Sequence, residues 1–336
     1  MITIVNDRVA MKHGAGGRAM RRLIEQVFLR GAGPAAAAMD DGAVIPMAGG
    51  ASLILTTDSH VIHPIVFPGG DIGRLAVAGT VNDLAMMGAT EPLGLTCAVV
   101  VEEGFAIDDL ERIQRSMTEA CAEAGTGIVA GDTKVMRRGE VDGIVINTTG
   151  VGQTWRPVRD SGARPGDVLI VTGTIGDHGM AVMAARNGFQ FDETLRSDVA
   201  PLNGLVRAVL AAGDVHAMKD PTRGGVASAL HEIAGKARVG IVIAEGAVPV
   251  RPAVRAAADL LGIDPLFIAN EGKAILAVRP SAADAVLAAL RAHPYGGDAA
   301  VIGACMHDGP GTVVVDTGFG RRRLSEPDGE LLPRIC

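Results

Sequence analysis

The stretch from Ile72 to Met87 constrains the fold most, because it predicts an apolar helix with a carboxylate near its centre. Small apolar residues dominate the stretch, which suits close burial, and Asp71 stands directly before it as an N-cap residue. Thr80, Asn82 and Asp83 interrupt the apolar pattern. A buried carboxylate without compensation strongly destabilises a fold. Asp83 therefore requires a metal ion, a polar partner or access to solvent.

Four further aspartates share this setting, since each lies where an apolar segment meets a turn. One of them ends a predicted strand at 52–57. Carboxylates gathered around a pocket bind Mg²⁺, and Mg²⁺ bridges the phosphates of a nucleotide. Taken singly, such an aspartate is more often a cap or turn residue, but five together favour a metal and nucleotide site. The candidate metal ligands are Asp41, Asp58, Asp83, Asp132 and Asp220.

Two glycine-rich segments lead into predicted helices. Residues 11–17 precede a helix at about 18–29, and residues 218–225 enter a helix that runs to about 236. Bare backbone N–H groups can approach phosphates closely, and a helix start favours an anion. The first segment matches neither the dinucleotide fingerprint nor the Walker pattern, so a flexible leader remains an alternative. Lys134 and Arg223 would supply cationic donors.

Composition narrows the class of protein. Hydrophobic residues make up 48% of the 336 residues but aromatic ones only 3%, so aliphatic side chains must fill the cores. The formal net charge of -7 argues against a nucleic-acid surface. No apolar run is long enough for a membrane helix, and the start lacks the regions of a signal peptide. The four cysteines have neither metal-ligand spacing nor a disulfide framework, which indicates a cytoplasmic protein.

The order of predicted elements indicates an α+β protein of two domains. In the first half, we expect helices at 72–87 and 108–124 and strands at 52–57, 93–101, 127–130 and 143–152. A turn at 164–167 opens the second half, with helices at 178–187, 202–212 and 282–292 and strands at 168–172, 274–278, 299–305 and 312–316. The similar order in both halves suggests a duplication.

The chain ends in a cysteine, Cys336. The run 320–334 before it is polar and rich in arginine and proline, which predicts an exposed, extended arm. Arg334 places a cation near the thiolate. Alone, such an end is more often an accident of where translation stops. As a functional alternative, an exposed arm can carry the Cys336 thiol into a distant pocket.

Seven segments, spread in order along the whole chain, resemble the HypE family of hydrogenase expression/formation proteins. That family of carbamoyl dehydratases belongs to the aminoimidazole ribonucleotide synthetase-like (PurM-like) superfamily, and the terminal cysteine motif is the most specific mark of the resemblance. The segments are residues 11–17, 68–73, 79–86, 131–135, 220–225, 270–273 and 333–336.

The resemblance implies a two-domain fold with a tail. Residues 1–155 would form an ATP-binding and dimerisation domain, whose sheet pairs with that of a second copy in a dimer β-barrel. Residues 156–318 would form an α/β sandwich domain, and residues 319–336 a flexible tail. The family also implies a homodimer with ATP near the dimer interface, and ATP and Mg²⁺ as cofactors.

The activity implied is an ATP-dependent dehydration on the chain's own tail. A carbamoyltransferase, HypF, would load a carbamoyl group onto the Cys336 sulfur, and this chain would convert the S-carboxamide into an S-thiocyanate. The cyano group would pass to iron on the HypC–HypD scaffold complex, as part of [NiFe]-hydrogenase maturation.

Roles for single residues follow from this chemistry as hypotheses. Lys134 would stabilise charge on the transferring phosphoryl group, and Glu271 would remove N–H protons, with His13 a weaker candidate base. A structural ion pair is the alternative for Lys134 and Glu271. The candidate catalytic residues are Cys336, Lys134, Glu271, Asp83 and His13. The candidate cofactor-binding residues are Gly14, Gly16, Gly17, Asp58, Gly70, Asn82, Asp132, Asn147, Asp220, Thr222, Arg223, Gly224 and Gly225.

Other functions compete with this one. A selenophosphate synthetase usually carries a reactive cysteine or selenocysteine near its N-terminus, and none precedes Lys12. A thiamine-monophosphate kinase has no use for a terminal cysteine. A non-catalytic adaptor that only presents the tail has no need of five buried carboxylates.

Overall fold

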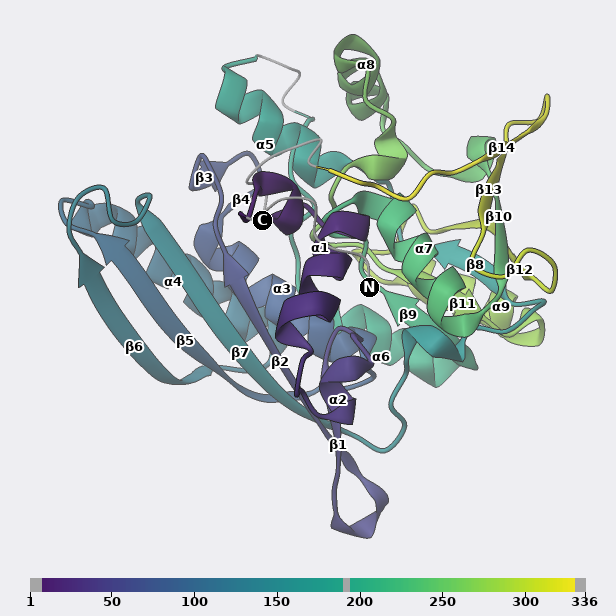
Figure 1. The fold of residues 1–336 in the computed structure, drawn as a ribbon, viewed down its shortest axis with the longest axis horizontal. Coiled ribbons are helices and arrows are strands. Elements are labelled where there is room, and N and C mark those ends of the chain that lie inside the picture. Colours follow the sequence, from purple (N-terminus) through teal and green to yellow (C-terminus); the bar gives the residue numbers. More distant parts are fainter. Residues whose placement is uncertain (1–7, 190–193, 330–336) are drawn as a thin grey trace.

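The computed structural model describes residues 8–189 and 194–329, and two β-sheets with their helices make up its two halves (Figure 1). The first sheet has the strand order β1-β2-β7-β5-β6, and the second has the order β14-β13-β10-β12-β8-β11-β9. In the described chain the first sheet is open, with β1 and β6 at its edges, and does not close into a barrel.

The N-terminal sheet carries two helices on one face. Its strands are β1 (Ala43–Pro46), β2 (Ser52–His60), β5 (Pro92–Glu102), β6 (Ile128–Met136) and β7 (Ile144–Thr154). The helices are α3 (Ile72–Met86) and α4 (Ile107–Ala124). The predicted N-cap is confirmed, because the Asp71 side chain accepts hydrogen bonds from the backbone N–H groups of Gly73 and Arg74. Side chains of β2 and β7 alternate between this face and the opposite one, which we call the open face.

Small residues let α3 lie close to the sheet. A Cβ at Gly150 would stand 2.7 Å from the Thr80 side chain, and one at Gly79 would stand 2.9 Å from the His60 ring. Such distances are shorter than ordinary van der Waals contact, so larger side chains would push the helix away. The close approach brings the middle of α3, with Asp83, beside β2.

The C-terminal half is a sheet with helices on both faces. Its strands are β8 (Val168–Val171), β9 (Val215–Lys219), β10 (Gly240–Ala244), β11 (Ile275–Val278), β12 (Ala300–Met306), β13 (Val313–Asp316) and β14 (Arg321–Arg323). Helix α7 (Gly225–Ala237) packs on one face, and α6 (Asn203–Ala212) and α9 (Ala283–Ala292) pack on the other. Helices α5 (Asp177–Asn187) and α8 (Pro252–Leu261) instead share a core with α3 and α4, which joins the two halves.

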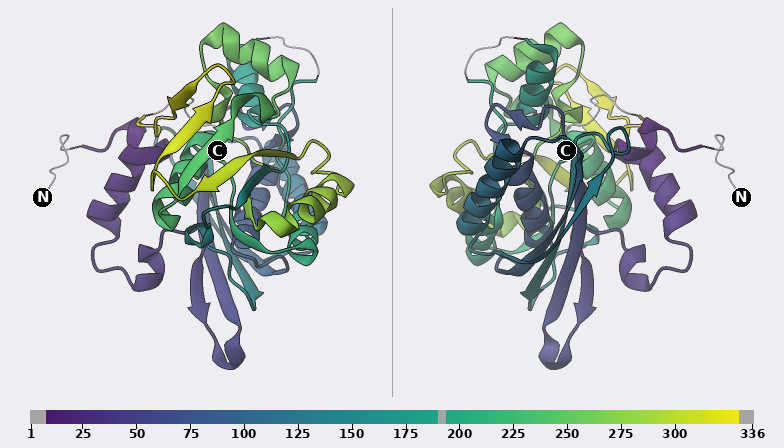
Figure 2. Two further views of the ribbon diagram at one scale, coloured as in Figure 1. Left: turned by 90° about the vertical axis from the view of Figure 1, so that its right-hand side faces the viewer. Right: turned by 90° about the vertical axis from the view of Figure 1, so that its left-hand side faces the viewer.

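The N-terminal segment lies against the side of this body (Figure 2). It contains α1 (Gly17–Leu23), a π-helix (Ile24–Phe28) and α2 (Pro34–Ala37). A two-stranded hairpin, β3 (Val66–Phe67) with β4 (Gly70–Asp71), precedes α3. In the described ranges, no helix combines the length and the apolar character needed to cross a bilayer.

The structure differs from the sequence prediction at several places. The strand expected at 127–130 continues as β6 through Asp132 and Lys134. Strand β14 and the buried side chain of Leu324 lie in the stretch expected to be an exposed arm from residue 319. Strands β9 and β10 and helix α8 were not predicted. Cys336 and the rest of 330–336 lie outside the described residues.

Candidate functional site

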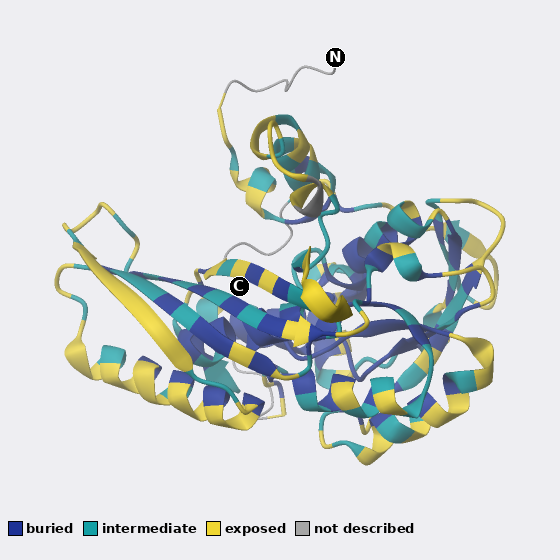
Figure 3. Ribbon diagram, turned by 90° about the horizontal axis from the view of Figure 1, so that it is seen from below, coloured by how far each residue is buried: buried dark blue, intermediate teal, exposed yellow. Residues whose placement is uncertain are grey.

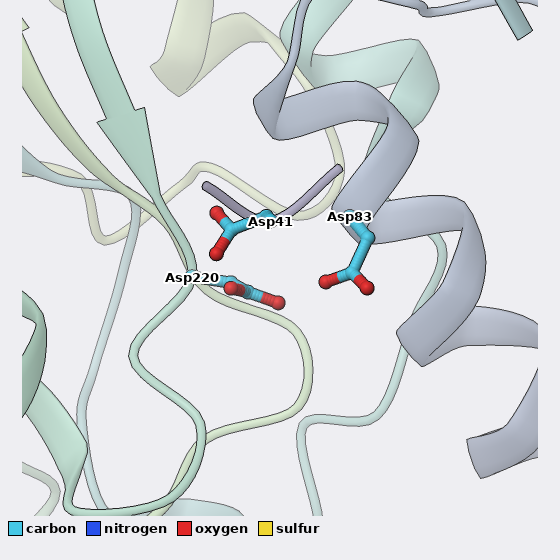
Figure 4. Close-up of side chains that lie close together, drawn as sticks. All are labelled: Asp41, Asp83 and Asp220. Atoms are coloured by element: carbon cyan, nitrogen blue, oxygen red, sulfur yellow. The ribbon is translucent and has the colours of Figure 1, made fainter. Parts of the chain in front are cut away.

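Three carboxylates from three elements meet between the two halves (Figure 4). Asp83 comes from α3, Asp41 lies just before β1, and Asp220 directly follows β9. Each offers an oxygen, and these oxygens lie within 4.8 Å of one another. The Thr56 hydroxyl bonds Asp83 Oδ2 at 2.7 Å and the Asp41 backbone carbonyl at 2.8 Å, which fixes the two aspartates. A set of carboxylate oxygens alone suits a hard divalent cation such as Mg²⁺.

The electrostatics of this cluster also favour a bound cation. Burial raises the pKa of Asp83 well above its usual value, and the neighbouring Asp220 and Asp41 raise it further. Burial likewise raises the pKa of Asp41 well above its usual value, although Lys219 opposes the shift. For Asp220, burial raises the pKa to about 6. A divalent cation would offset this penalty by stabilising the ionised carboxylates.

A cavity of about 870 Å³ opens beside the cluster. Both halves of the chain line it, with α1, β2 and α3 on one side and β9, α7 and Glu271 on the other. Its volume lies within the range of sites that enclose small molecules and cofactors. Asp58, Thr222 and Arg223 are among its lining residues, so the structure brings these candidates together with Asp41, Asp83 and Asp220.

Glu271 stands in the wall of this cavity. Its side chain is only 4% exposed, and Oε1 has no hydrogen-bond partner among the described residues. Burial, and then the charges of Asp220 and Asp58, raise the pKa of Glu271 well above its usual value. A buried carboxyl group without a partner, with a raised pKa, is suited to exchange a proton with a bound substrate. The alternative of a structural ion pair therefore finds no support at Glu271.

A lysine that the sequence analysis did not single out lies next to the cluster. Lys219 Nζ pairs with Asp41, with Asp160 at 3.4 Å and with Glu232 at 3.1 Å. Asp160 in turn pairs with Lys236 at 2.7 Å. Burial alone would raise the pKa of Asp160, but Lys219 and Lys236 hold it below its usual value. The only sequence signal was the position of Lys219, directly before Asp220 in the glycine-rich segment 218–225.

The candidate glycines Gly16 and Gly17 of the N-terminal segment allow other parts of the chain to approach closely. Gly16 and Gly17 have φ angles of +77° and +67°, a region that favours glycine. A Cβ at Gly16 would stand 2.8 Å from the Arg223 carbonyl oxygen. The Arg223 guanidinium donates to the Gly14 carbonyl at 3.3 Å and lies 3.9 Å from an Asp58 carboxylate oxygen. The two glycine-rich segments therefore meet at the edge of the cavity.

The glycines that begin α7 are similarly confined. Gly224 and Gly225 have φ angles of +78° and +61°. A Cβ at Gly225 would stand 2.6 Å from the Ile268 carbonyl oxygen. These glycines hold the start of α7 close to the segment that leads to Glu271, while Thr222 reaches the cavity.

Asn82, Gly70 and His13 are among the candidate residues that lie away from the cavity lining. Asn82 is buried and donates to the carbonyls of Ala200 and Glu271, so its amide holds α3 to the C-terminal half. Gly70, which lies in the β3–β4 hairpin, packs against Val199. His13 accepts a hydrogen bond from the backbone of Ala10 in a short 3₁₀ helix. In the structure, each of these three residues makes a contact that positions a segment of the chain.

Asp132, Lys134 and Asn147 lie on the other side of the sheet. The strand register places Asn147, Ala98 and Asp132 in one row on the open face, opposite α3. Lys134 Nζ lies 3.6 Å from Asp132, and both side chains are well exposed. Within one chain, the sheet separates these residues from the aspartate cluster. Cys336, the candidate substrate, falls outside the described residues.

Comparison with known proteins agrees with this arrangement. Residues 39–154 match the N-terminal domain, and residues 164–316 the C-terminal domain, of AIR synthase related proteins. The carbamoyl dehydratase HypE of Rhizobium leguminosarum bv. viciae is 48% identical to this chain, over 100% of the chain and 97% of the relative. The chain belongs to the HypE family of carbamoyl dehydratases.

Solved structures of the HypE family share the fold over nearly the whole chain. HypE in a crystal structure of the HypE–HypF complex has a TM-score of 0.86 at 47% identity, over 91% of this chain and 99% of that one. A HypE structure in complex with ATP has a TM-score of 0.82 at 45% identity, over 98% of this chain and 100% of that one. The predicted family and its two-domain α+β fold are therefore confirmed.

Proposed function

We propose that this chain uses ATP to dehydrate an S-carbamoyl group on Cys336 to an S-thiocyanate, which supplies the cyanide ligand for the iron centre of a [NiFe]-hydrogenase. The observation that carries the proposal is the cluster of Asp41, Asp83 and Asp220 at a nucleotide-sized cavity, with the buried Glu271 in its wall, whose Oε1 has no hydrogen-bond partner in the described part of the chain. A HypE relative of known structure binds ATP, which supports ATP as the cofactor.

The aspartates would hold Mg²⁺, which neutralises charge on the phosphates of ATP. Asp41, Asp83 and Asp220 are the inner candidates, and Asp58 lies at the same cavity. The backbone of Gly16 and Gly17, together with Thr222 and Arg223, lines the space left for the nucleotide.

The reaction needs two steps. The carbamoyl oxygen first attacks the γ-phosphorus of ATP, and ADP leaves. Loss of the two N–H protons and departure of phosphate then form the C≡N bond, while the S–C bond stays intact. Glu271 would accept one of these protons, since it lines the cavity and its Oε1 has no hydrogen-bond partner among the described residues, and the departing phosphate would take the other.

In a homodimer, the candidate residues Asp132 and Lys134 could also contribute to a site. The open face carries the exposed Leu55, and the edge strand β6 is exposed along almost its whole length (Figure 3, the long yellow strand). A second copy paired over this face would form the barrel implied by the family. Asp132 and Lys134 would then lie at the interface, and we propose that they act on the site of the partner copy.

The proposed function also implies the protein partners and the cellular compartment of this chain. A HypE relative forms a complex with HypF, so we propose HypF as the carbamoyl donor and the HypC–HypD complex as the acceptor of the cyano group. The buried cysteines Cys97, Cys121 and Cys305 are free thiols, which supports a cytoplasmic location. We propose 1–155 and 156–318 as the two domains, and 319–336 as a C-terminal segment whose first part, as far as Pro327, is held to the C-terminal sheet and to α1.

Removal of the terminal cysteine tests the proposal. A chain lacking only Cys336 should keep its fold and its affinity for ATP, because no described residue of the cavity is changed. It should not gain the about 43 Da of a carbamoyl group when incubated with HypF, carbamoyl phosphate and ATP. Carbamoylation of the truncated chain would exclude Cys336 as the acceptor and leave room for an adaptor or a small-molecule kinase.

A further inference from the structure

Residues 324–327, which we call the tail base, are held to the C-terminal half. Strand β14 directly before them pairs with β13, and the Leu324 side chain is fully buried. The Leu324 carbonyl accepts a hydrogen bond of 3.0 Å from His231 Nε2 on α7. The chain is therefore fixed at this point, beyond residue 319 where the sequence predicted the tail to begin.

The tail base is also held to α1 in the N-terminal segment. The backbone N–H of Arg18 donates to the Pro327 carbonyl at 3.0 Å. The Arg21 guanidinium pairs with the Glu326 carboxylate, and the side chains are 33% and 18% exposed. A Cβ at Gly17 would stand 2.3 Å from the Pro327 carbonyl oxygen, so only glycine permits this approach. Two views of the ribbon show the yellow segment that follows β14 beside α1 (Figure 2).

The same helix forms part of the wall of the nucleotide cavity. Gly17, Met20 and Arg21 line the cavity, whereas Glu326 and Pro327 do not. One short element therefore touches the nucleotide site and the base of the arm that carries Cys336.

We propose that Arg21 and Glu326 are a positioning pair that anchors the tail base on α1, and that nucleotide binding and tail placement are coupled through this anchor. The inference rests on the proposed function of Cys336 for its catalytic consequence. Neither residue touches the reacting atoms, since both act through α1 and the tail base.

The anchor matters because it sets the length of the arm. The nine residues after Pro327 span at most about 30 Å, so Cys336 can reach the cluster only if the arm starts close by. A short tether also keeps the thiol at a high effective concentration near the site. Coupling is reciprocal, so contacts that hold α1 in place also raise the affinity for ATP.

A double-mutant cycle on ATP binding tests the pair. Glu326→Gln should weaken ATP binding by about three- to tenfold, the size expected for a partly buried ion pair, although Glu326 lies outside the cavity. In an Arg21→Gln background, the same substitution should have no further effect. Asp328→Asn is the matched control, because Asp328 is an exposed acid two residues away, and ATP affinity should be unchanged. Unchanged affinity in Glu326→Gln, or additive effects in the cycle, would overturn the proposal.

Hydrogen exchange at a single amide reports the anchor without catalysis. The Arg18 amide, bonded to Pro327, should exchange at least severalfold faster in Glu326→Gln than in the wild type or Asp328→Asn. Equal exchange in all three proteins would show that the ion pair does not hold the tail base.

A measurement of the dehydration rate separates this proposal from the proposed function. Carbamoylated Glu326→Gln should lose water severalfold more slowly than the wild type at saturating ATP, and an equal rate would show that the anchor does not place the thiol. A wild-type chain that never loses water would contradict the proposed function. The ATP affinities and the exchange rate of the Arg18 amide would still show whether Arg21 and Glu326 anchor the tail base.

Discussion

At the scale of single residues, the site depends on carboxyl groups that the fold keeps out of water. The sequence singled out Asp83 because a carboxylate inside an apolar helix needs compensation, and Asp41 and Asp220 lie beside it. It could not single out Lys219, because a lysine next to a motif gives no sign of whether it is buried. Nor could it show that Asn82 is engaged with backbone carbonyls, since that depends on how the two halves pack.

Glu271→Gln tests the proposed base. The amide keeps the size of the side chain but cannot accept a proton, so dehydration should fall by at least about a hundredfold, whereas ATP binding should remain. Single-turnover mass spectrometry and ATP titration measure the two quantities. Near-normal turnover would remove Glu271 as the base.

The raised pKa of Asp220, about 6, predicts a dependence on pH. In the unfolded chain this group loses its proton near pH 3.8, so the folded state holds the proton more tightly. The stabilisation is complete below pH 4 and is lost as the pH rises through 6. Without Mg²⁺, thermal unfolding should show Asp220→Asn becoming more stable relative to the wild type between pH 4 and 7, by up to about 3 kcal/mol.

Mg²⁺ supplies the control for this pH dependence. Saturating Mg²⁺ should stabilise the wild type at pH 7 more than Asp220→Asn, because the cation binds the ionised carboxylate. A stability difference that does not change with pH would exclude an unfavourable ionisation of Asp220.

At the scale of secondary-structure elements, periodicity and caps predicted most helices and strands of the sheets. Helix α4 and strand β7 lie within two residues of their predicted bounds. The edge strand β6 is longer than predicted, because it pairs with β5 on one side only and needs no apolar pattern. Strand β14 was missed for a related reason, since three consecutive arginines give no apolar alternation.

Gly17→Ala tests the close packing of α1. The added Cβ would meet the Pro327 carbonyl oxygen at a position with positive φ, which should destabilise the seating of α1 by about 1–3 kcal/mol. ATP affinity should fall accordingly. Gly33→Ala is the matched control in the same segment, because a Cβ there has no atom within 4 Å. Equal ATP affinities in the two variants would contradict this role of Gly17.

At the scale of the whole molecule, the candidate nucleotide site lies between two halves that share a core, and the open face of the N-terminal sheet is the proposed interface with a second copy. The sequence predicted the two halves and the family. It could not place the cavity between them, because that depends on contacts such as Lys219 with Asp41 that join distant parts of the chain. It also could not show that the chain remains fixed as far as Pro327.

Leu55→Asp tests the proposed dimer. Leu55 is 37% exposed on the open face, and a charge there would be buried without a partner in a paired sheet. Light scattering should give the mass of a monomer for this variant. Leu260→Asp, exposed on α8, should remain a dimer. Equal masses for the two variants would exclude the open face as the interface.

The most direct test of the central claim is a single turnover on the carbamoylated chain, freed from HypF. On addition of ATP and Mg²⁺, the intact mass should fall by about 18 Da, the loss of one water, with the modification remaining on Cys336. Asp83→Asn, carbamoylated in the same way, should keep its mass, because the cluster can no longer hold Mg²⁺ on ATP. A wild-type mass that does not change, or an equal loss in Asp83→Asn, would contradict the account.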